Sequence, residues 1–253
     1  MPRRLGQHFL RSGSVEQLLA AIAPARTDTF LEIGPGAGAL TRPLASRCKN
    51  VVAVELDASL AASLSERVPA NVTIVQGDAL TVDLRALVPR GARVAGNLPY
   101  YASSPLLRRL LELRDHVVDL HVMVQQEVAE RVASPPGSKA YGILSIFFAL
   151  WADVEIAARF PPGAFNPAPK VSSAVLRIAF RPEPRAEVAD PAAFEKLVKT
   201  AFGRRRRTLE NNLQDSYANL KESLKLLNIE GSRRAETLSV VEFARLSSVL
   251  TPR

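Results

Sequence analysis

The chain has 253 residues, of which 47% are hydrophobic and 23% charged, so global disorder is excluded and a sizeable core can be buried. Its formal net charge of +8 favours a polyanionic partner, nucleic acid first. The longest apolar run, residues 143–151, is shorter than the roughly 18 residues that a membrane helix needs, and the N-terminal residues lack signal-peptide character. We expect a cytoplasmic protein without a membrane partner.

Few residues could hold a disulfide or a metal. Cys48 has no second cysteine to pair with, which is typical of proteins in a reducing compartment. The three histidines, His8, His116 and His121, are scattered along the chain. The sequence therefore predicts no metal site.

In the first 180 residues, short β-rich apolar runs alternate with helical patterns. Strands are expected at residues 29–33, 51–55, 72–75, 93–95 and 120–124, and helices at residues 15–22, 40–47, 58–67 and 105–113. This alternation predicts βαβ units, hence an α/β fold with a mostly parallel, Rossmann-like sheet covered by helices on both faces. Two later strands, at 154–160 and 173–180, have only a Pro-rich loop between them, so we expect that pair to be antiparallel.

After residue 180 the pattern becomes helical. The segment 181–185, Arg-Pro-Glu-Pro-Arg, is typical of a linker. Asp190 is expected to cap the following helix with Pro191 in its first turn, and Ser239 to cap the last helix. Helices are expected at residues 194–202, 208–213, 220–227 and 240–250. The sequence thus predicts one domain over residues 1–180 and a small helical domain over 181–253.

A glycine-rich turn follows the first predicted strand. Gly34, Gly36 and Gly38 form a Gly-x-Gly-x-Gly pattern, which lets a ligand approach the backbone closely. Glu55 ends the second strand, where a carboxylate can accept hydrogen bonds from both hydroxyls of a ribose. Asp78 follows the third strand, where it can accept from an adenine amine. This order favours a nucleoside cofactor, either S-adenosylmethionine or NAD, since the turn also satisfies the loose dinucleotide fingerprint.

The fourth predicted strand leads into Asn97-Leu98-Pro99-Tyr100. At the carboxyl edge of a parallel sheet, the Asn97 side-chain oxygen and the Leu98 carbonyl could grip the two N–H groups of an exocyclic amine and aim its lone pair at a methyl donor. Pro99 stiffens such a loop, and Tyr100 offers a face on which a flipped base can stack. A dehydrogenase has no use for this loop, so the loop favours S-adenosylmethionine over NAD.

A run of four arginines, Arg204, Arg205, Arg206 and Arg207, lies in the predicted helical domain. Such a run is often only a solvated face. On a chain with this net charge it equally suits contacts to RNA phosphates, and we predict that role.

With these motifs in order, the chain resembles the ribosomal RNA adenine N6-dimethyltransferase family, and most of all its bacterial small-subunit (16S) branch. The resemblance covers nearly the whole chain. It is carried by eight ordered segments: Leu5-Gly-Gln-His-Phe-Leu, Glu32-Ile-Gly-Pro-Gly-Ala-Gly, Val54-Glu-Leu-Asp, Gly77-Asp-Ala, Gly96-Asn-Leu-Pro-Tyr, Gln126-Glu-Val-Ala-Glu-Arg, Ser138-Lys-Ala-Tyr-Gly and Phe165-Asn-Pro-Ala-Pro-Lys-Val-Ser-Ser-Ala-Val.

The resemblance implies a class I methyltransferase fold. It also implies that His8 and Leu10 contact the cofactor from the N-terminal segment, that Asn97 helps to bind it, and that Tyr100 and Phe165 sandwich the target adenine. The implied reaction methylates two adjacent adenines in a hairpin loop of 16S rRNA, on an immature small subunit. The resemblance further implies that residues 1–180 form the catalytic domain and that the helical domain docks the ribosome. We expect a monomer.

Two departures from the family pattern concern single residues. His8 stands where the family usually has Asn, and Tyr101 follows Tyr100 where a smaller or polar residue is expected.

Two other functions remain open at this stage. A large-subunit rRNA methyltransferase of the macrolide-resistance type would share the cofactor turn and the Asn97 loop. A ribosome-assembly factor without catalysis would keep the fold, although it would not need Glu55, Asn97 and Tyr100. A DNA adenine methyltransferase is disfavoured, because such enzymes more often begin the tetrapeptide with an acidic residue.

Overall fold

The structure is a computed structural model that describes residues 9–253. The chain divides into two compact units: unit 1 comprises residues 1–129 and 154–180, and unit 2 comprises residues 130–153 and 181–253. The end of unit 1 at residue 180 coincides with the predicted cut. Residues 130–153, however, precede that cut and belong to unit 2.

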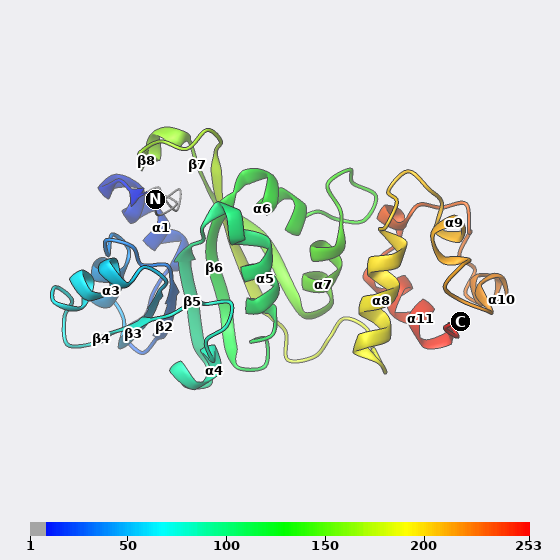
Figure 1. The fold of residues 1–253 in the computed structure, drawn as a ribbon, viewed down its shortest axis with the longest axis horizontal. Coiled ribbons are helices and arrows are strands. Elements are labelled where there is room, and N and C mark those ends of the chain that lie inside the picture. The colour runs from blue at the N-terminus through cyan, green and yellow to red at the C-terminus, as the bar shows by residue number, and fades with distance from the viewer. Residues whose placement is uncertain (1–8) are drawn as a thin grey trace. The chain divides into compact units, whose positions relative to one another are not determined.

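Unit 1 is built on a sheet that, within residues 9–253, has seven strands in the order β4-β3-β2-β5-β6-β9-β7 (Figure 1). Four pairs are parallel, β3–β4, β2–β3, β2–β5 and β5–β6, whereas β9 is antiparallel to β6 and lies beside β7. The mostly parallel sheet predicted from the alternating pattern is thereby confirmed. The strands are β2 (Thr29–Ile33), β3 (Asn50–Glu55), β4 (Val72–Gln76), β5 (Ala92–Asn97), β6 (Val117–Gln125), β7 (Ala152–Phe160) and β9 (Ser173–Phe180).

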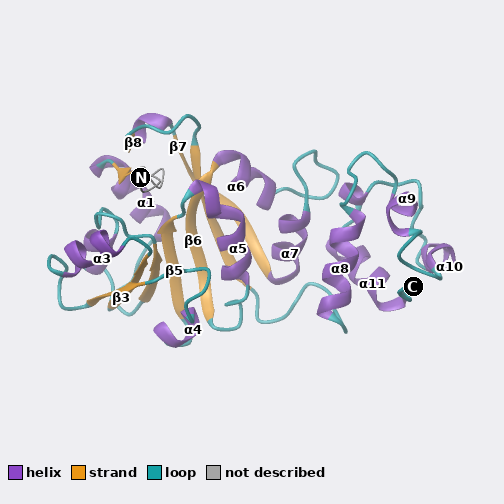
Figure 2. Ribbon diagram, viewed as in Figure 1, coloured by secondary structure: helices purple, strands orange, loops and turns teal. Residues whose placement is uncertain are grey.

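Helices separate the strands of this sheet (Figure 2). Contacts join α1 to β9, and join α2 and α3 to β3. Strand β2, which lies between β3 and β5, is buried from Phe30 to Ile33. The helices are α1 (Ser12–Ile22), α2 (Thr41–Ala45), α3 (Ala58–Ser65), α4 (Leu84–Leu87), α5 (Ser103–Leu111) and α6 (Gln126–Val132).

A second, two-stranded sheet lies at the start of the described chain. β1 (Phe9–Leu10) pairs antiparallel with β8 (Phe165–Asn166), which follows the short 3-10 helix Pro162–Ala164. The Arg11 backbone N–H also donates to the Ala164 carbonyl at 2.9 Å. Residues 9–11 are therefore bonded to a stretch more than 150 residues later in the chain.

An ionic cluster anchors the beginning of β5, the strand that leads into the predicted catalytic loop at residues 97–100. The Arg93 guanidinium contacts Asp28 at 2.8 Å and Asp119 at 2.9 Å, and it lies 5.1 Å from the centre of the Phe30 ring. These side chains are largely buried, so the two carboxylates compensate the desolvated arginine. Asp119 keeps a lowered pKa despite its burial, because His121 and Arg93 stabilise its charge.

Unit 2 is mainly helical, as predicted. Its helices are α7 (Ile143–Trp151), α8 (Pro191–Ala201), α9 (Leu209–Leu213), α10 (Leu220–Leu226) and α11 (Val240–Val249), with a 3-10 helix at Ala235–Thr237. Both predicted caps are confirmed: the Asp190 carboxylate accepts from two backbone N–H groups of α8, and Ser239 forms a capping box with Glu242 in α11. Helix α8 contacts α7, α9 and α11.

The predicted linker at 181–185 is tied to unit 2. The backbone N–H of Arg181 donates to the Trp151 carbonyl, and that of Arg185 to the Leu150 carbonyl, both at 2.8 Å. Both guanidinium groups contact Asp153. Among the helices of residues 9–253, none combines the length and the hydrophobicity needed to cross a bilayer.

Candidate active site

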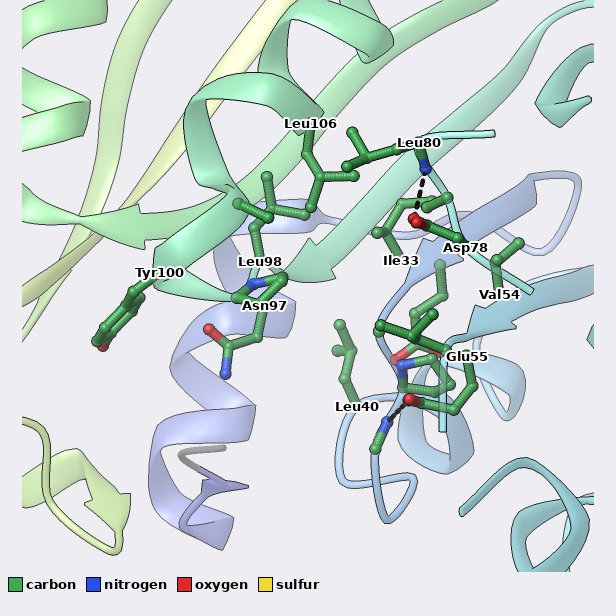
Figure 3. Close-up of a pocket in the computed structure, with 18 of the residues that line it drawn as sticks. Ile33, Leu40, Val54, Glu55, Asp78, Leu80, Asn97, Leu98, Tyr100 and Leu106 are labelled. Carbon is green, nitrogen blue, oxygen red and sulfur yellow. Dashed lines mark hydrogen bonds between the residues drawn. The ribbon is translucent and has the colours of Figure 1, made fainter. Parts of the chain in front are cut away.

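The four parallel strands β2, β3, β4 and β5 end at one edge of the sheet, and a pocket of about 250 Å³ lies there. Most of its lining follows directly after those strand ends, at residues 33–36, 54–56, 77–80 and 97–102 (Figure 3). Ligands of open α/β folds bind at this edge because the loops there converge. The residues predicted for the cofactor turn and for the catalytic loop are thus brought into one pocket.

The glycine turn adopts a backbone conformation that favours glycine. Gly34, Gly36 and Gly38 have φ angles of 70°, 56° and 85°, in the left-handed region. At Gly38 an added Cβ would also lie 2.5 Å from the Leu64 side chain in α3. The turn therefore requires glycine for its conformation and, at Gly38, for packing.

Glu55 is held in place by backbone donors. One carboxylate oxygen accepts from the Gly36 N–H and the other from the Asp57 N–H, each at 2.9 Å. The residue is buried at the end of β3 and lines the pocket. Each oxygen still has a lone pair, so the fixed carboxylate can accept further hydrogen bonds from a ligand.

Asp78 lies beside Glu55 on the same side of the pocket (Figure 3). Its Oδ1 accepts from the Leu80 N–H at 2.9 Å, and the preceding Gly77 N–H donates to the Glu55 carbonyl at 2.9 Å. The loop after β4 is therefore bonded to the end of β3, which fixes the two carboxylates near each other.

A third carboxyl in the pocket lining, Glu32, lies one residue before the end of β2. It is 1% exposed, lines the pocket, and its Oε2 has no hydrogen-bond partner within residues 9–253. Burial raises the pKa of Glu32 to about 8, with a further rise from Glu55 and an opposing effect of the nearby Thr41 hydroxyl. Glu32 is part of a family motif in the sequence, but no function was predicted for its side chain. The signal was a charged residue inside the apolar strand 29–33.

The catalytic loop leaves β5 at Asn97 and is bonded to the next strand. The Leu98 N–H donates to the Met123 carbonyl of β6 at 3.0 Å, and the Ala102 N–H closes a turn on the Pro99 carbonyl at 3.0 Å. An added Cβ at Gly96 would lie 2.5 Å from the Ile33 carbonyl oxygen, so β5 can approach β2 this closely only with glycine there. The loop is rigid and directly beside the glycine turn.

Tyr100 lies at the opposite end of the pocket from Asp78 and Glu55, with the Asn97 side chain between them (Figure 3). The Tyr100 ring is half-buried, and its hydroxyl lies 2.6 Å from the Ser173 hydroxyl. Tyr101, the residue that departs from the family pattern, lines the same pocket and is 63% exposed.

The remaining predicted residues differ in where they lie. Leu10 lines the pocket, but His8 is outside the described residues. Phe165 does not reach the pocket: its side chain is 0% exposed and packs in the core of unit 1 with Ile22 and Phe160. The Phe165 ring thus offers no exposed face in this structure, and its role in stacking stays a prediction.

The four arginines lie in unit 2, in the exposed loop between α8 and α9. Arg205 differs from the others because its guanidinium donates to the Lys139 carbonyl at 2.7 Å and contacts the Glu236 carboxylate at 3.1 Å. No ion pair of Arg204, Arg206 or Arg207 is found in the described part of the chain. Three of the four arginines are thus available to a partner.

The sequence profile described as ribosomal RNA adenine dimethylase matches residues 2–251. The chain belongs to this family. It is 42% identical over 251 residues to ribosomal RNA small subunit methyltransferase A of Dichelobacter nodosus, covering 98% of this chain and 95% of that protein. It is 45% identical over 260 residues to the protein of the same name from Geobacter metallireducens, covering 98% and 94%.

Solved structures of other methyl- and dimethyladenosine transferases share the fold. A dimethyladenosine transferase from Plasmodium falciparum superposes with a TM-score of 0.81 at 23% identity, over 96% of this chain and 99% of that one. The 23S rRNA methyltransferase ErmE superposes with a TM-score of 0.73 at 26% identity, over 95% and 98%. The predicted family and the class I methyltransferase fold are confirmed, and the protein is an enzyme, an adenine dimethyltransferase of ribosomal RNA.

Proposed function

We propose that this enzyme transfers methyl groups from S-adenosylmethionine to the N6 amines of two adjacent adenines in a hairpin loop of small-subunit rRNA. The observation that carries the proposal is the single pocket edge that unites the Glu55 carboxylate, the glycine turn and the Asn97 loop. The choice of small-subunit RNA rests on relatives at 42% and 45% identity, whose names specify that subunit.

The pocket suits S-adenosylmethionine in its donor chemistry. Glu55 offers two fixed oxygens to ribose hydroxyls, and Asp78 an oxygen to the adenine amine. Glu32 presents a buried Oε2 without a partner in residues 9–253, which a ligand ammonium group would satisfy. Leu10, Gly34 and the apolar lining would cover the rest of the molecule. When bound, this cofactor supplies a methyl group that its sulfonium has already activated.

The chain's own part in the reaction is alignment. The lone pair of an adenine N6 is delocalised into the ring, so this amine is a poor nucleophile. In the proposed arrangement the Asn97 side-chain oxygen and the Leu98 carbonyl accept the two N–H bonds of the amine and turn its lone pair toward the donor. The bond from the Leu98 N–H to β6 holds that carbonyl in place before substrate arrives.

No strong general base is required, because the amine proton can leave to water after the methyl group has been transferred. Tyr100 serves as the stacking face for the flipped adenine. Burial raises its pKa further above the ordinary value of a phenol, which is already neutral at physiological pH.

Unit 1 would then be the catalytic part, and unit 2 the part that docks the assembling small subunit. The exposed Arg204, Arg206 and Arg207 support contact with RNA phosphates in unit 2. We propose further that the enzyme works as a monomer in the cytoplasm, where its ribosomal substrate is assembled.

A methylation assay tests the substrate. Immature small subunits without the modification and large-subunit RNA are offered side by side with radiolabelled S-adenosylmethionine, and the labelled nucleotides are mapped by nuclease digestion. We expect N6,N6-dimethyladenosine at two adjacent positions of the small-subunit RNA. Label in large-subunit RNA alone would favour the second candidate, a 23S rRNA methyltransferase, which ErmE at 26% identity represents.

A further inference from the structure

We propose that Ser173 is a positioning residue of the catalytic site, and that it acts by holding the Tyr100 ring at the angle on which the target base stacks. The proposal rests on the function proposed above. The observation that supports it is the 2.6 Å contact between the Tyr100 and Ser173 hydroxyls, two residues that are 73 positions apart in the chain. Neither the motif of the catalytic loop nor the pocket lining includes Ser173.

Tyr100 is fixed at its backbone end by the loop itself. The Ser103 hydroxyl donates to the Pro99 carbonyl at 3.0 Å and lies 3.4 Å from the Tyr100 carbonyl. These bonds act on the backbone carbonyls around Tyr100 and not on its ring. The contact with Ser173 acts at the far tip of the ring, where small rotations produce the largest displacement.

Ser173 is well placed to be an immobile partner. It is the first residue of β9, its Cα is paired with Gln125 of β6, and the neighbouring Ser172 carbonyl accepts from the Gln126 N–H at 2.9 Å. The residue is 0% exposed. Its short side chain has a single rotatable carbon–carbon bond, so the hydroxyl loses little entropy on binding the ring.

The chemical state of the ring agrees with this role. A phenol keeps its proton at physiological pH and burial raises the Tyr100 pKa further, so the contact is a hydrogen bond between two neutral hydroxyls. A neutral hydrogen bond of this kind orients the ring without changing its charge. Strand β9, which adds the antiparallel pairing to the sheet, thereby takes part in shaping the catalytic pocket.

Removing the bond should affect the chemical step rather than RNA binding. Phosphate contacts dominate the affinity for RNA, whereas the ring angle matters only once the base has entered the pocket. We expect Ser173→Ala to lower kcat by about three- to ten-fold, the range of one neutral hydrogen bond. The KM for RNA and the Kd for S-adenosylmethionine should stay unchanged.

The test is a double-mutant cycle on the full-length enzyme. Ser173→Ala, Tyr100→Phe and the double variant are compared with wild type in kcat, KM for RNA, cofactor Kd and thermal unfolding. Ser172→Ala, at the serine directly before β9, is the matched control. Tyr100→Phe keeps the ring and removes only the hydroxyl, so it tests the bond even if Ser173→Ala is unstable.

The proposal expects equal losses of kcat in both single variants and no further loss in the double variant. The proposal is overturned if the losses of kcat add in the double variant, or if Ser173→Ala is no slower than Ser172→Ala. It is also overturned if the substitution changes only KM and thermal stability. Activity is measured on whichever ribosomal RNA the wild type methylates. A wild type that prefers large-subunit RNA therefore overturns the proposed substrate without touching Ser173, and one that methylates neither RNA overturns both.

Discussion

Asn97 is the residue on which the proposed chemistry depends most. It ends β5, lines the pocket between the carboxylates and Tyr100, and its backbone is set by the parallel pairing of β5 with β6 (Figure 3). Its contribution would be to orient the amine, a contribution that a shorter side chain cannot make.

We expect Asn97→Ala to slow methyl transfer by about 10²- to 10³-fold, as when one preorganised polar group is removed from an active site. Cofactor affinity should remain largely intact, because Glu55 and Asp78 retain their hydrogen bonds. Single-turnover transfer and calorimetric binding of S-adenosylmethionine measure the two quantities. Asn50→Ala, at the exposed amino end of β3, is the control. Near-normal transfer by Asn97→Ala would contradict the alignment role.

Glu32 makes the stability of the apo enzyme depend on pH. Burial raises its pKa from 4.5 to about 8, so the folded state keeps a proton that the unfolded state loses. Between these two values folding takes up a proton, and stability from this residue falls as the pH rises. Between the two pKa values the free energy of unfolding changes by about −1.4 kcal/mol per pH unit, and above the folded-state pKa it no longer depends on this residue's ionisation.

Glu32→Gln, which cannot ionise, should remove this dependence. Denaturant unfolding of both proteins between pH 5.5 and 8.5 should show wild type losing stability relative to the variant as the pH rises. Glu66→Gln, at an exposed position, controls for the loss of a carboxylate. Parallel curves for wild type and Glu32→Gln would show that the buried carboxyl ionises in the folded state as freely as in the unfolded chain.

At the scale of elements, the approach of β5 to β2 determines where the catalytic loop lies. The two strands are paired with Ile33 opposite Gly96, and an added Cβ would meet the Ile33 carbonyl at 2.5 Å. A contact this short forces one strand to move, and the loop that follows Gly96 would move with it.

Gly96→Ala should therefore destabilise the fold by about 1–3 kcal/mol, as overpacked core positions do, and should also impair methyl transfer by shifting Asn97. Gly163→Ala, where an added Cβ meets nothing within 4 Å, should be neutral in both. Thermal unfolding and the transfer assay measure the two effects. A Gly96→Ala enzyme with wild-type stability would show that the strands separate at no cost.

Strands β2 to β5 were predictable because each is a short, mostly apolar run followed by glycine or ended by a polar residue, and their parallel pairing brings those ends together. Helix α7 was not predicted: its sequence is apolar nearly all round, so it has no amphipathic period, and it packs inside unit 2. Residues 130–153 are also separated in sequence from the rest of unit 2, so nothing in the sequence indicated that they belong to it. The burial of Phe165 and the Ser173 contact depend on tertiary packing, of which local sequence carries no signal.

At the scale of the whole molecule, the chain has a net charge of +8, but not every basic side chain is available to bind RNA. Many arginines contact carboxylates, as Arg93 does with Asp28 and Asp119 in unit 1 and Arg185 with Asp153 in unit 2. Such paired cations add little to attraction for RNA. The loop between α8 and α9 differs, because Arg204, Arg206 and Arg207 are exposed there and form no ion pair within residues 9–253.

Replacing Arg204, Arg206 and Arg207 together by Gln should weaken binding to small subunits and flatten its salt dependence. Each lost phosphate contact to single-stranded RNA lowers the slope of log affinity against log salt by about 0.7, so the triple variant should lose about 2. Arg205→Gln is the internal control: it breaks contacts to Lys139 and Glu236, so it should lower the thermal stability and leave the slope nearly unchanged. Filter binding of labelled subunits over a salt series measures both slopes. If the triple variant keeps the wild-type slope, the arginine loop is a solvated face and the docking surface of unit 2 lies elsewhere.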